Sequence, residues 1–207
     1  MTRIYLVRHG QTEWNRVERF RGLIDVPLNE VGLAQARSLG ERLAAERDIA
    51  AIYSSPLSRA ILTAEPLAQH LGLTVQPLAG INDLNFGDWQ GLSPAEVAER
   101  WPELYQRWLL APHTVRFPRG ESLAASKARA FATLDDLALH HAGKAFVVVS
   151  HKVICKLLVC ATLGMGEAHY WQIEIDNASF SVIEHHDGLY VVTRINDTYH
   201  LGSRRSE

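Results

Sequence analysis

An arginine and a histidine, Arg8 and His9, stand at the end of the first predicted strand of this chain. They follow the apolar run 4–7, which is rich in strand-forming residues, and Gly10 comes directly after them. This pattern is typical of a buried central strand that delivers polar groups to a sheet edge. Ligands of open α/β sheets bind beyond the carboxyl ends of the strands, so we expect a functional site at this edge.

Two further apolar runs end in polar groups of the same kind. Residues 145–150 form the clearest buried strand and lead into His151, while residues 49–54 form a second strand a few positions before Arg59. Alternation of strands and helices favours a parallel sheet, whose strands share one carboxyl edge. Because a buried imidazole must find partners for both nitrogens, two strand-end histidines in one sheet are unusual as core residues.

Transfer of a phosphoryl group is the chemistry that these side chains support. Its transition state spreads charge over three equatorial oxygens, which positioned cations stabilise. Arg8 and Arg59 offer planar forks that fit phosphate oxygens, and His151 offers a third donor. His9 can attack phosphorus and carry the group as phosphohistidine. The sequence contains no evident aspartate cluster suited to Mg²⁺, so we expect neither a metal nor a cofactor.

Four blocks of sequence carry a family resemblance, and they are Arg8-His9-Gly10-x-Thr12-x-x-Asn15 followed by Arg21-Gly22; Ser54-Ser55-Pro56-Leu57-x-Arg59-Ala60-x-x-Thr63-Ala64; Phe86-Gly87-x-Trp89-x-Gly91; and Val149-Ser150-His151. In this order they resemble the histidine phosphatase superfamily, in its phosphoglycerate-mutase-like branch. The resemblance implies that His9 is the nucleophile and that Arg8, Arg59 and His151 bind the phosphoryl group. The other candidate substrate contacts are Asn15, Arg21, Gly22, Phe86, His113 and His200, of which the last two either meet the substrate or only pack.

A carboxyl group must give a proton to the leaving alcohol and take one from the attacking water. The family usually has a glutamate three residues before its Phe-Gly pair, and this chain has Asp83 there. Aspartate is shorter by about 1.5 Å, and an error near 1 Å can cost on the order of 10²-fold in rate. We expect Asp83 to carry the proton through an advanced backbone or a bridging water, with Asp88 as the alternative.

The resemblance favours a phosphatase for a small phosphorylated metabolite over a mutase, because the segment over the site is short and holds few cations. Within the family the chain looks most like the metal-independent phosphoserine phosphatases, although Phe86 replaces the histidine that this group has before the cap glycine. Phosphoglycerate mutase and sugar-phosphate phosphatase activities therefore stay open as alternatives. An alternative of another class is a weakly catalytic regulator that binds a phosphorylated ligand.

The predicted fold is a three-layer α/β/α domain with a mostly parallel sheet and helices on both faces. We expect a single domain over residues 1–207, in which the irregular segment 73–120 forms a cap over the site. Apolar periodicity, strand formers and capping residues predict helices over about 30–46, from Pro56, from Ser93, over 122–141 and over 153–163, and a final hairpin of strands 179–184 and 189–194. The tail 202–207 is expected to be disordered.

Composition narrows the classes of partner. A chain of 207 residues with 47% hydrophobic residues can fill one core, and a net charge of −2 argues against a general nucleic-acid binder. Residues 1–21 nevertheless hold five arginines against two glutamates, which suits a small anionic ligand. No long apolar run or signal peptide is evident, so we expect a cytoplasmic protein without membrane contact, and a homodimer stays open. Cys155 and Cys160 match no metal or redox spacing and are predicted to be core residues.

Overall fold

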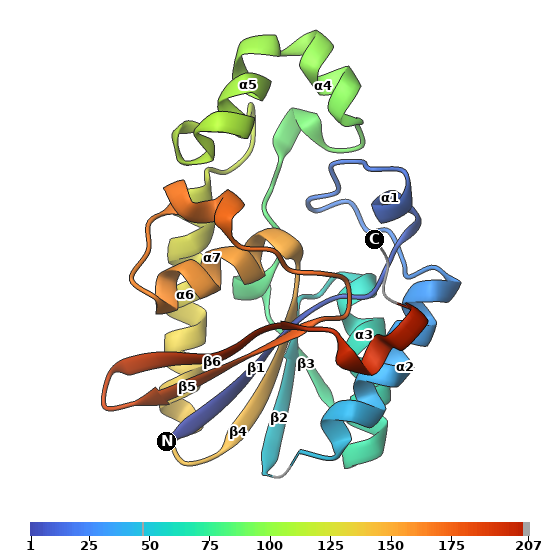
Figure 1. The fold of residues 1–207 in the computed structure, drawn as a ribbon, viewed down its shortest axis with the longest axis vertical. Helices are drawn as coiled ribbons and strands as arrows, with labels where there is room; N and C mark the ends of the chain where they lie inside the picture. Colours follow the sequence, from blue (N-terminus) through green and yellow to red (C-terminus); the bar gives the residue numbers. More distant parts are fainter. Residues whose placement is uncertain (47, 205–207) are drawn as a thin grey trace.

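The computed structural model describes residues 1–46 and 48–204. Within them, six strands form one sheet in the order β3-β2-β4-β1-β5-β6 (Figure 1). The first four strands along the chain are parallel to one another. β5 pairs antiparallel with β1, and β6 pairs antiparallel with β5, which confirms a mostly parallel sheet. The strands are β1 (Thr2–Arg8), β2 (Ile49–Ser54), β3 (Val75–Pro77), β4 (Ala145–Ser150), β5 (Phe180–His186) and β6 (Leu189–Asp197).

Two pairs of helices cover the two faces of the sheet. The central strand β1 is buried on both sides, and its alternate residues point to opposite layers because strand side chains alternate. Ile4 and Leu6 pack with α6 and α7, whereas Tyr5 and Val7 pack with α2 and α3. This arrangement confirms the predicted three layers. The covering helices are α2 (Glu30–Ala44), α3 (Ser58–Leu71), α6 (Leu123–His140) and α7 (Lys152–Thr162).

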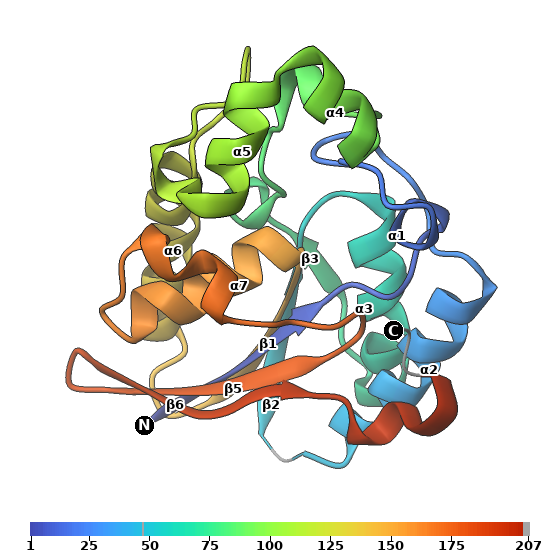
Figure 2. The same cartoon turned by 45° about the horizontal axis from the view of Figure 1, so that its top comes forward.

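Two short helices rise above the carboxyl ends of the parallel strands (Figure 2). They are α4 (Pro94–Arg100) and α5 (Pro102–Leu110). The helix predicted from Ser93 begins with a capping box, in which the side chains of Ser93 and Glu96 accept hydrogen bonds from each other's backbone N–H groups. The buried residues below them include Trp89 and Phe117, which pack with residues of α7. The aromatic side chains of this segment therefore pack on a helix of the main body.

The predicted start of the cap at residue 73 is wrong. Residues Val75–Pro77 form β3, which pairs with β2 at the edge of the sheet. A strand of three residues that ends in proline is too short to show an alternating pattern, so the sequence did not reveal it. The segment that lies over the strand ends begins after η1 (Ala79–Ile81) and includes η2 (Gly87–Trp89) and η3 (Pro112–Thr114).

The remaining elements are short helical segments: α1 (Glu13–Arg16), η4 (Glu167–Gln172) and η5 (Tyr199–Arg204). The expectation of a disordered tail is wrong for residues 202–204, which belong to η5, and residues 205–207 lie outside the described part of the chain. Cys155 and Cys160 are free and buried, as predicted. No helix in the described residues is long and apolar enough to cross a membrane.

Candidate active site

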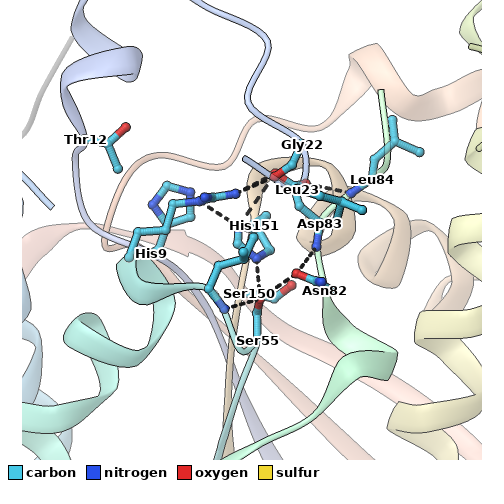
Figure 3. A network of polar contacts seen from close by, with 12 residues as sticks. His9, Thr12, Gly22, Leu23, Ser55, Asn82, Asp83, Leu84, Ser150 and His151 are labelled. Carbon is cyan, nitrogen blue, oxygen red and sulfur yellow. Dashed lines mark hydrogen bonds and ion pairs between the residues drawn. The ribbon is translucent and has the colours of Figure 1, made fainter. Parts of the chain in front are cut away.

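The ends of three neighbouring parallel strands bring the predicted catalytic side chains together. Arg8 is the last residue of β1 and His9 follows it, Arg59 lies in the first turn of α3 after β2, and His151 follows β4. All four side chains are buried. The rings of His9 and His151 are 5.2 Å apart and meet edge to face. Figure 3 shows these two rings within one polar network.

One ring nitrogen of His9 is fixed and the other is free. Its Nδ1 lies 2.6 Å from the carbonyl oxygen of Gly10, and because a carbonyl only accepts, Nδ1 carries the proton. Nε2 is buried and has no hydrogen-bond partner in the described residues. Burial lowers the pKa of His9 well below its usual value, and the nearby cations Arg59, Arg21 and Arg8, with His151, lower it further. His9 is therefore a neutral imidazole with an unshared electron pair on Nε2.

The guanidinium of Arg59 is held by four partners on three segments of the chain. Nη2 donates to the carbonyl oxygen of Gly22 at 2.7 Å, and Nη1 donates to that of Ile24 at 2.9 Å. Nε donates to Nδ1 of His151 at 3.3 Å. Nη2 also lies 3.3 Å from Oδ2 of Asp83. This set of contacts fixes the plane of the guanidinium against the two histidines, which is the preorganisation that phosphoryl transfer requires.

A chain of hydrogen bonds sets the proton of His151. Because Arg59 can only donate, Nδ1 of His151 accepts and its Nε2 carries the proton. Nε2 lies 2.7 Å from Oγ of Ser55, whose hydroxyl donates to Oδ1 of Asn82 at 2.9 Å (Figure 3). Burial lowers the pKa of His151 well below its usual value, and Arg59 lowers it further. Ser55 lies within the second quoted motif and Asn82 directly precedes Asp83, but neither residue type indicated this role from the sequence.

Two arginines of the site have a buried nitrogen without a partner. Nη1 of Arg8 donates to the carbonyl oxygen of Ile175 at 2.7 Å, but its Nε is buried and unpartnered among the described residues. Nε of Arg21 is buried and unpartnered in the same way. Burial lowers the pKa of Arg21 to about 9, with a further contribution from Arg8. Since native structures rarely leave buried donors unsatisfied, these two groups indicate an anionic ligand.

The carboxyl group of Asp83 belongs to the same cluster. Its Oδ1 accepts a hydrogen bond from the backbone N–H of Leu84 at 2.9 Å, and its Oδ2 lies 3.7 Å from Nδ1 of His151. Burial raises the pKa of Asp83, and Arg59 and Arg21 oppose the rise. Asp88, the alternative proton carrier, forms an ion pair with Arg119. The structure thus brings Asp83 to the strand ends and not Asp88.

A cavity of about 720 Å³ opens above the cluster. Of the predicted residues, Arg8, Asn15, Arg21, Asp83 and Phe86 line it. His9, Arg59 and His151 are fully buried and are not among the described residues that line the cavity. Oδ1 of Asn15 accepts hydrogen bonds from Thr12, so this side chain also orders the loop after β1.

The two remaining histidines are not brought to the cavity. His113 is exposed on η3, and His200 has its Nε2 3.0 Å from the carbonyl oxygen of Ala178. Neither is among the described residues that line the cavity.

Gly22 contributes its backbone and cannot be replaced without strain. Its φ is +53°, in the left-handed region that favours glycine. A Cβ atom on Gly22 would lie 2.2 Å from Oε1 of Gln90 and 2.9 Å from the carbonyl oxygen of Leu84. Its own carbonyl is one of the partners of Arg59. Gly22 was predicted to contact the substrate, and in the structure its backbone carbonyl oxygen orients Arg59.

One wall of the cavity comes from an irregular segment, residues 164–174, that no periodic pattern of the sequence marked as part of the site. Tyr170, Trp171 and Glu174 line the cavity, and Glu174 forms ion pairs with Lys152 and Lys156 of α7. Residues 164–174 contain no strand, no long helix and no periodic pattern that could have marked them. The described residues also hold no group of three His, Cys, Asp or Glu side chains suited to a metal ion.

Comparison with known sequences gives three informative relatives. Phosphoserine phosphatase 1 of Hydrogenobacter thermophilus is 40% identical over 202 residues, which cover 98% of this chain and 95% of that protein. A metal-independent phosphoserine phosphatase of Arabidopsis thaliana is 33% identical, with 98% and 84% covered. The probable phosphoglycerate mutase GpmB of Yersinia pestis is 31% identical, with 97% and 95% covered.

Solved structures and the family model agree with these relatives. The YhfR protein of Bacillus stearothermophilus superposes with a TM-score of 0.93 at 31% identity, covering 97% of this chain and all of that one. A mutant phosphoserine phosphatase of Entamoeba histolytica in complex with phosphoserine gives 0.88 at 30% identity, with the same coverage. The model of the histidine phosphatase superfamily, branch 1, matches residues 4–198. The chain belongs to branch 1 of the histidine phosphatase superfamily.

Proposed function

We propose that this phosphatase hydrolyses small phosphomonoesters without a metal ion, through a phosphohistidine formed on His9. The observation that carries the proposal is the free, buried Nε2 of His9. A neutral imidazole whose other nitrogen is fixed by Gly10 presents its electron pair in one direction, which is what in-line attack on phosphorus needs. Its depressed pKa keeps the nucleophile unprotonated through the neutral pH range.

Arg8, Arg59 and His151 are proposed to bind the three equatorial oxygens of the phosphoryl group. The first two supply permanent positive charge, which offsets the negative charge of the transition state in place of a metal ion. His151 is neutral in the described structure because burial and neighbouring cations disfavour its charge. A phosphoryl dianion has the opposite effect, so when the substrate binds, Nδ1 of His151 takes up a proton, gives up the hydrogen bond from Nε of Arg59 and donates a hydrogen bond to a phosphoryl oxygen.

Asp83 is proposed to move the proton in both half-reactions. In the first, Nε2 of His9 forms a bond to phosphorus, the P–O bond to the alcohol breaks, and the carboxyl group of Asp83 gives its proton to the leaving oxygen. In the second, water loses a proton to the carboxylate of Asp83 and attacks phosphorus, and the N–P bond breaks to release inorganic phosphate. The raised pKa of Asp83 suits the acid that the first step requires.

Phosphoserine is proposed as a substrate, since the relatives from Hydrogenobacter thermophilus and Arabidopsis thaliana and the solved neighbour from Entamoeba histolytica are named phosphoserine phosphatases. The segment 82–118 is proposed as the cap that encloses the substrate, because Phe86, Pro94, Tyr105, Trp108 and Leu109 line the cavity from it. Phosphoglycerate mutase activity is a second candidate, supported by the likeness to a probable mutase. A cytoplasmic location and a homodimer stay predictions of the sequence.

Turnover of p-nitrophenyl phosphate in the presence of EDTA tests the proposal. The wild-type protein should release phosphate at an undiminished rate, and a phosphorylated histidine at position 9 should be detected by mass spectrometry after rapid quenching. His9→Ala should abolish both, whereas His70→Ala, at an exposed position on α3, should change neither. A wild-type protein that binds phosphate without turnover would instead identify a phospho-ligand-binding regulator, and strict dependence on Mg²⁺ would end the mechanism.

A further inference from the structure

Arg21 differs from the other cationic side chains that line the cavity. Among the described residues, no hydrogen bond or ion pair ties its guanidinium to the protein, and its Nε is buried. Every other lining cation has a protein partner: Arg8 the carbonyl of Ile175, Arg16 the carboxylate of Glu13, Arg19 the carbonyl of Gly91 and Glu96, and Lys152 the carboxylate of Glu174.

The position of Arg21 is electrostatically unfavourable in the absence of a bound anion. Its pKa is lowered to about 9, first by burial and then by the positive charge of Arg8, with Arg59 adding to the effect. Asp83 opposes the shift, but Asp83 is already 3.3 Å from Arg59. A charged donor that is buried without a partner costs free energy, so its presence in a cavity wall points to a ligand.

The surroundings of Arg21 indicate which part of the substrate it meets. The proposed pocket supplies one cationic group for each equatorial oxygen of the phosphoryl group, from Arg8, Arg59 and His151. Arg21 comes from the loop after α1 and lines the cavity together with Asp83 of the catalytic cluster and Tyr170 of the aromatic wall. Because the three equatorial oxygens already have a donor each, the unpartnered guanidinium of Arg21 is available to a second anionic group of the substrate.

We propose that Arg21 binds a carboxylate on the alcohol portion of the substrate, which makes it a specificity-determining residue. The enzyme then prefers phosphomonoesters of hydroxy acids over phosphomonoesters of uncharged or cationic alcohols. Guanidinium and carboxylate pair through two parallel hydrogen bonds, a geometry that an ammonium group cannot reproduce. This proposal rests on the proposed hydrolysis at His9 and assigns the substrate class of the same site.

Matched pairs of substrates test the assignment. Phosphoserine and phosphoethanolamine differ only by the carboxylate, and 3-phosphoglycerate and glycerol 3-phosphate differ by a carboxylate against a hydroxymethyl group. The wild-type kcat/KM should be about 10–100 times higher for the acid of each pair, the range expected for one charge-assisted pairing. Arg21→Gln should remove most of this preference, because it should lower kcat/KM for the acid of each pair far more than for its uncharged or cationic counterpart.

Two further variants distinguish a direct contact between Arg21 and the substrate carboxylate from general electrostatic attraction and from loss of folding. Arg16→Gln removes one positive charge from the same part of the chain, where the arginine is exposed and bonded to Glu13, and should keep the preference intact. Arg21→Lys keeps the charge and loses the fork, so it should lower the preference by about 3–10-fold while Tm stays near wild type. This variant decides the matter if Arg21→Gln does not fold.

Three results would overturn the assignment, and they differ from failure of the proposed function. They are a wild-type enzyme that hydrolyses p-nitrophenyl phosphate without preferring either acid, an Arg21→Gln variant that slows both members of each pair equally, and an Arg21→Lys variant with an unchanged preference. Equal slowing of both members would place Arg21 on the phosphoryl group. Absence of any turnover by the wild-type enzyme would instead remove the proposed function.

Discussion

The Nε2 atom of His151 lies 2.7 Å from the hydroxyl oxygen of Ser55, and this contact decides which nitrogen of His151 faces the phosphoryl pocket. Ser55 follows β2 and His151 follows β4, so the contact links the ends of two paired strands. With Nε2 committed to Ser55, only Nδ1 is left to gain a proton when an anion binds. Ser55 is therefore a positioning residue, since it acts through the imidazole.

The variant Ser55→Ala should lower kcat for p-nitrophenyl phosphate by about 10-fold, because the imidazole loses the partner that fixes its tautomer and orientation. The buried Nε2–H is left unsatisfied, so the free energy of unfolding should fall by about 1–3 kcal/mol. Steady-state kinetics and urea unfolding measure the two effects. Ser55→Thr keeps the hydroxyl and should restore most of kcat, and a wild-type kcat for Ser55→Ala would show that His151 needs no such support.

Removal of each proposed phosphoryl-binding group should slow turnover strongly. Arg8→Ala, Arg59→Ala and His151→Ala should each lower kcat by about 10²–10³-fold, the scale for loss of one preorganised donor. The measurement is kcat with p-nitrophenyl phosphate, with Tm recorded for each variant. Arg37→Ala, at an exposed position on α2, is the matched control and should retain wild-type kcat. A near-wild-type rate for any of the three would remove that residue from the pocket.

Close approach of helix α2 to the catalytic loop predicts a stability effect. A Cβ atom on Gly32 would lie 2.1 Å from the carbonyl oxygen of Gln11, and one on Gly10 would lie 2.7 Å from the carbonyl oxygen of Gly32. Gly32→Ala should therefore lower the free energy of unfolding by about 1–3 kcal/mol, as overpacking does, and should lower kcat by shifting the loop that holds His9. Urea unfolding and steady-state kinetics check both.

Gly166→Ala is the control for this prediction. Gly166 has a φ of −77°, which any residue adopts, and no atom lies within 4 Å of the Cβ position. Its stability should stay within about 0.5 kcal/mol of wild type. Equal stability of Gly32→Ala and Gly166→Ala would mean that α2 can move away from the loop at little cost.

The sequence was sufficient for those parts of the site that follow strongly patterned strands. The apolar runs before His9 and His151 are buried strands that end side by side, and the helices over residues 30–46 and 122–141 are present with bounds shifted by one or two residues. In these segments local pattern and tertiary burial agree, because a strand covered on both faces must be apolar throughout.

The contacts missed from the sequence join segments far apart in the chain. Ser55 meets His151 and Asn82, and the carbonyl oxygen of Ile175 accepts from Arg8, although none of these pairs shares a local pattern. Hydrogen bonds of this kind depend on strand order and on where irregular segments come to lie in the folded chain. Residue types and spacing therefore predicted the reacting groups, and the folded structure was needed for the groups that orient them.

The pH dependence of kcat/KM should differ between two kinds of substrate. As the acid for an alkyl phosphate, Asp83 must be protonated, and burial raises its pKa above the usual value. The reactive fraction is then complete below this pKa and falls about tenfold per pH unit above it. At low pH, protonation of His9 removes its nucleophilic electron pair, and because its pKa is lowered this happens only well below pH 6.5. We expect phosphoserine hydrolysis to decline with rising pH more steeply than p-nitrophenyl phosphate hydrolysis, and identical profiles would contradict this role.

Substitution of Asp83 tests the proton transfer directly. Asp83→Asn cannot donate the proton, so it should slow phosphoserine hydrolysis by about 10²–10⁴-fold and p-nitrophenyl phosphate hydrolysis far less, because nitrophenolate leaves as a stable anion. It should also remove the difference between the two pH profiles. Asp83→Glu tests the reach of the shorter side chain: faster phosphoserine turnover would show a site that suits a longer acid, and slower turnover a backbone adjusted to aspartate. Equal slowing of both substrates by Asp83→Asn would assign Asp83 to the orientation of Arg59, whose Nη2 lies 3.3 Å from its Oδ2.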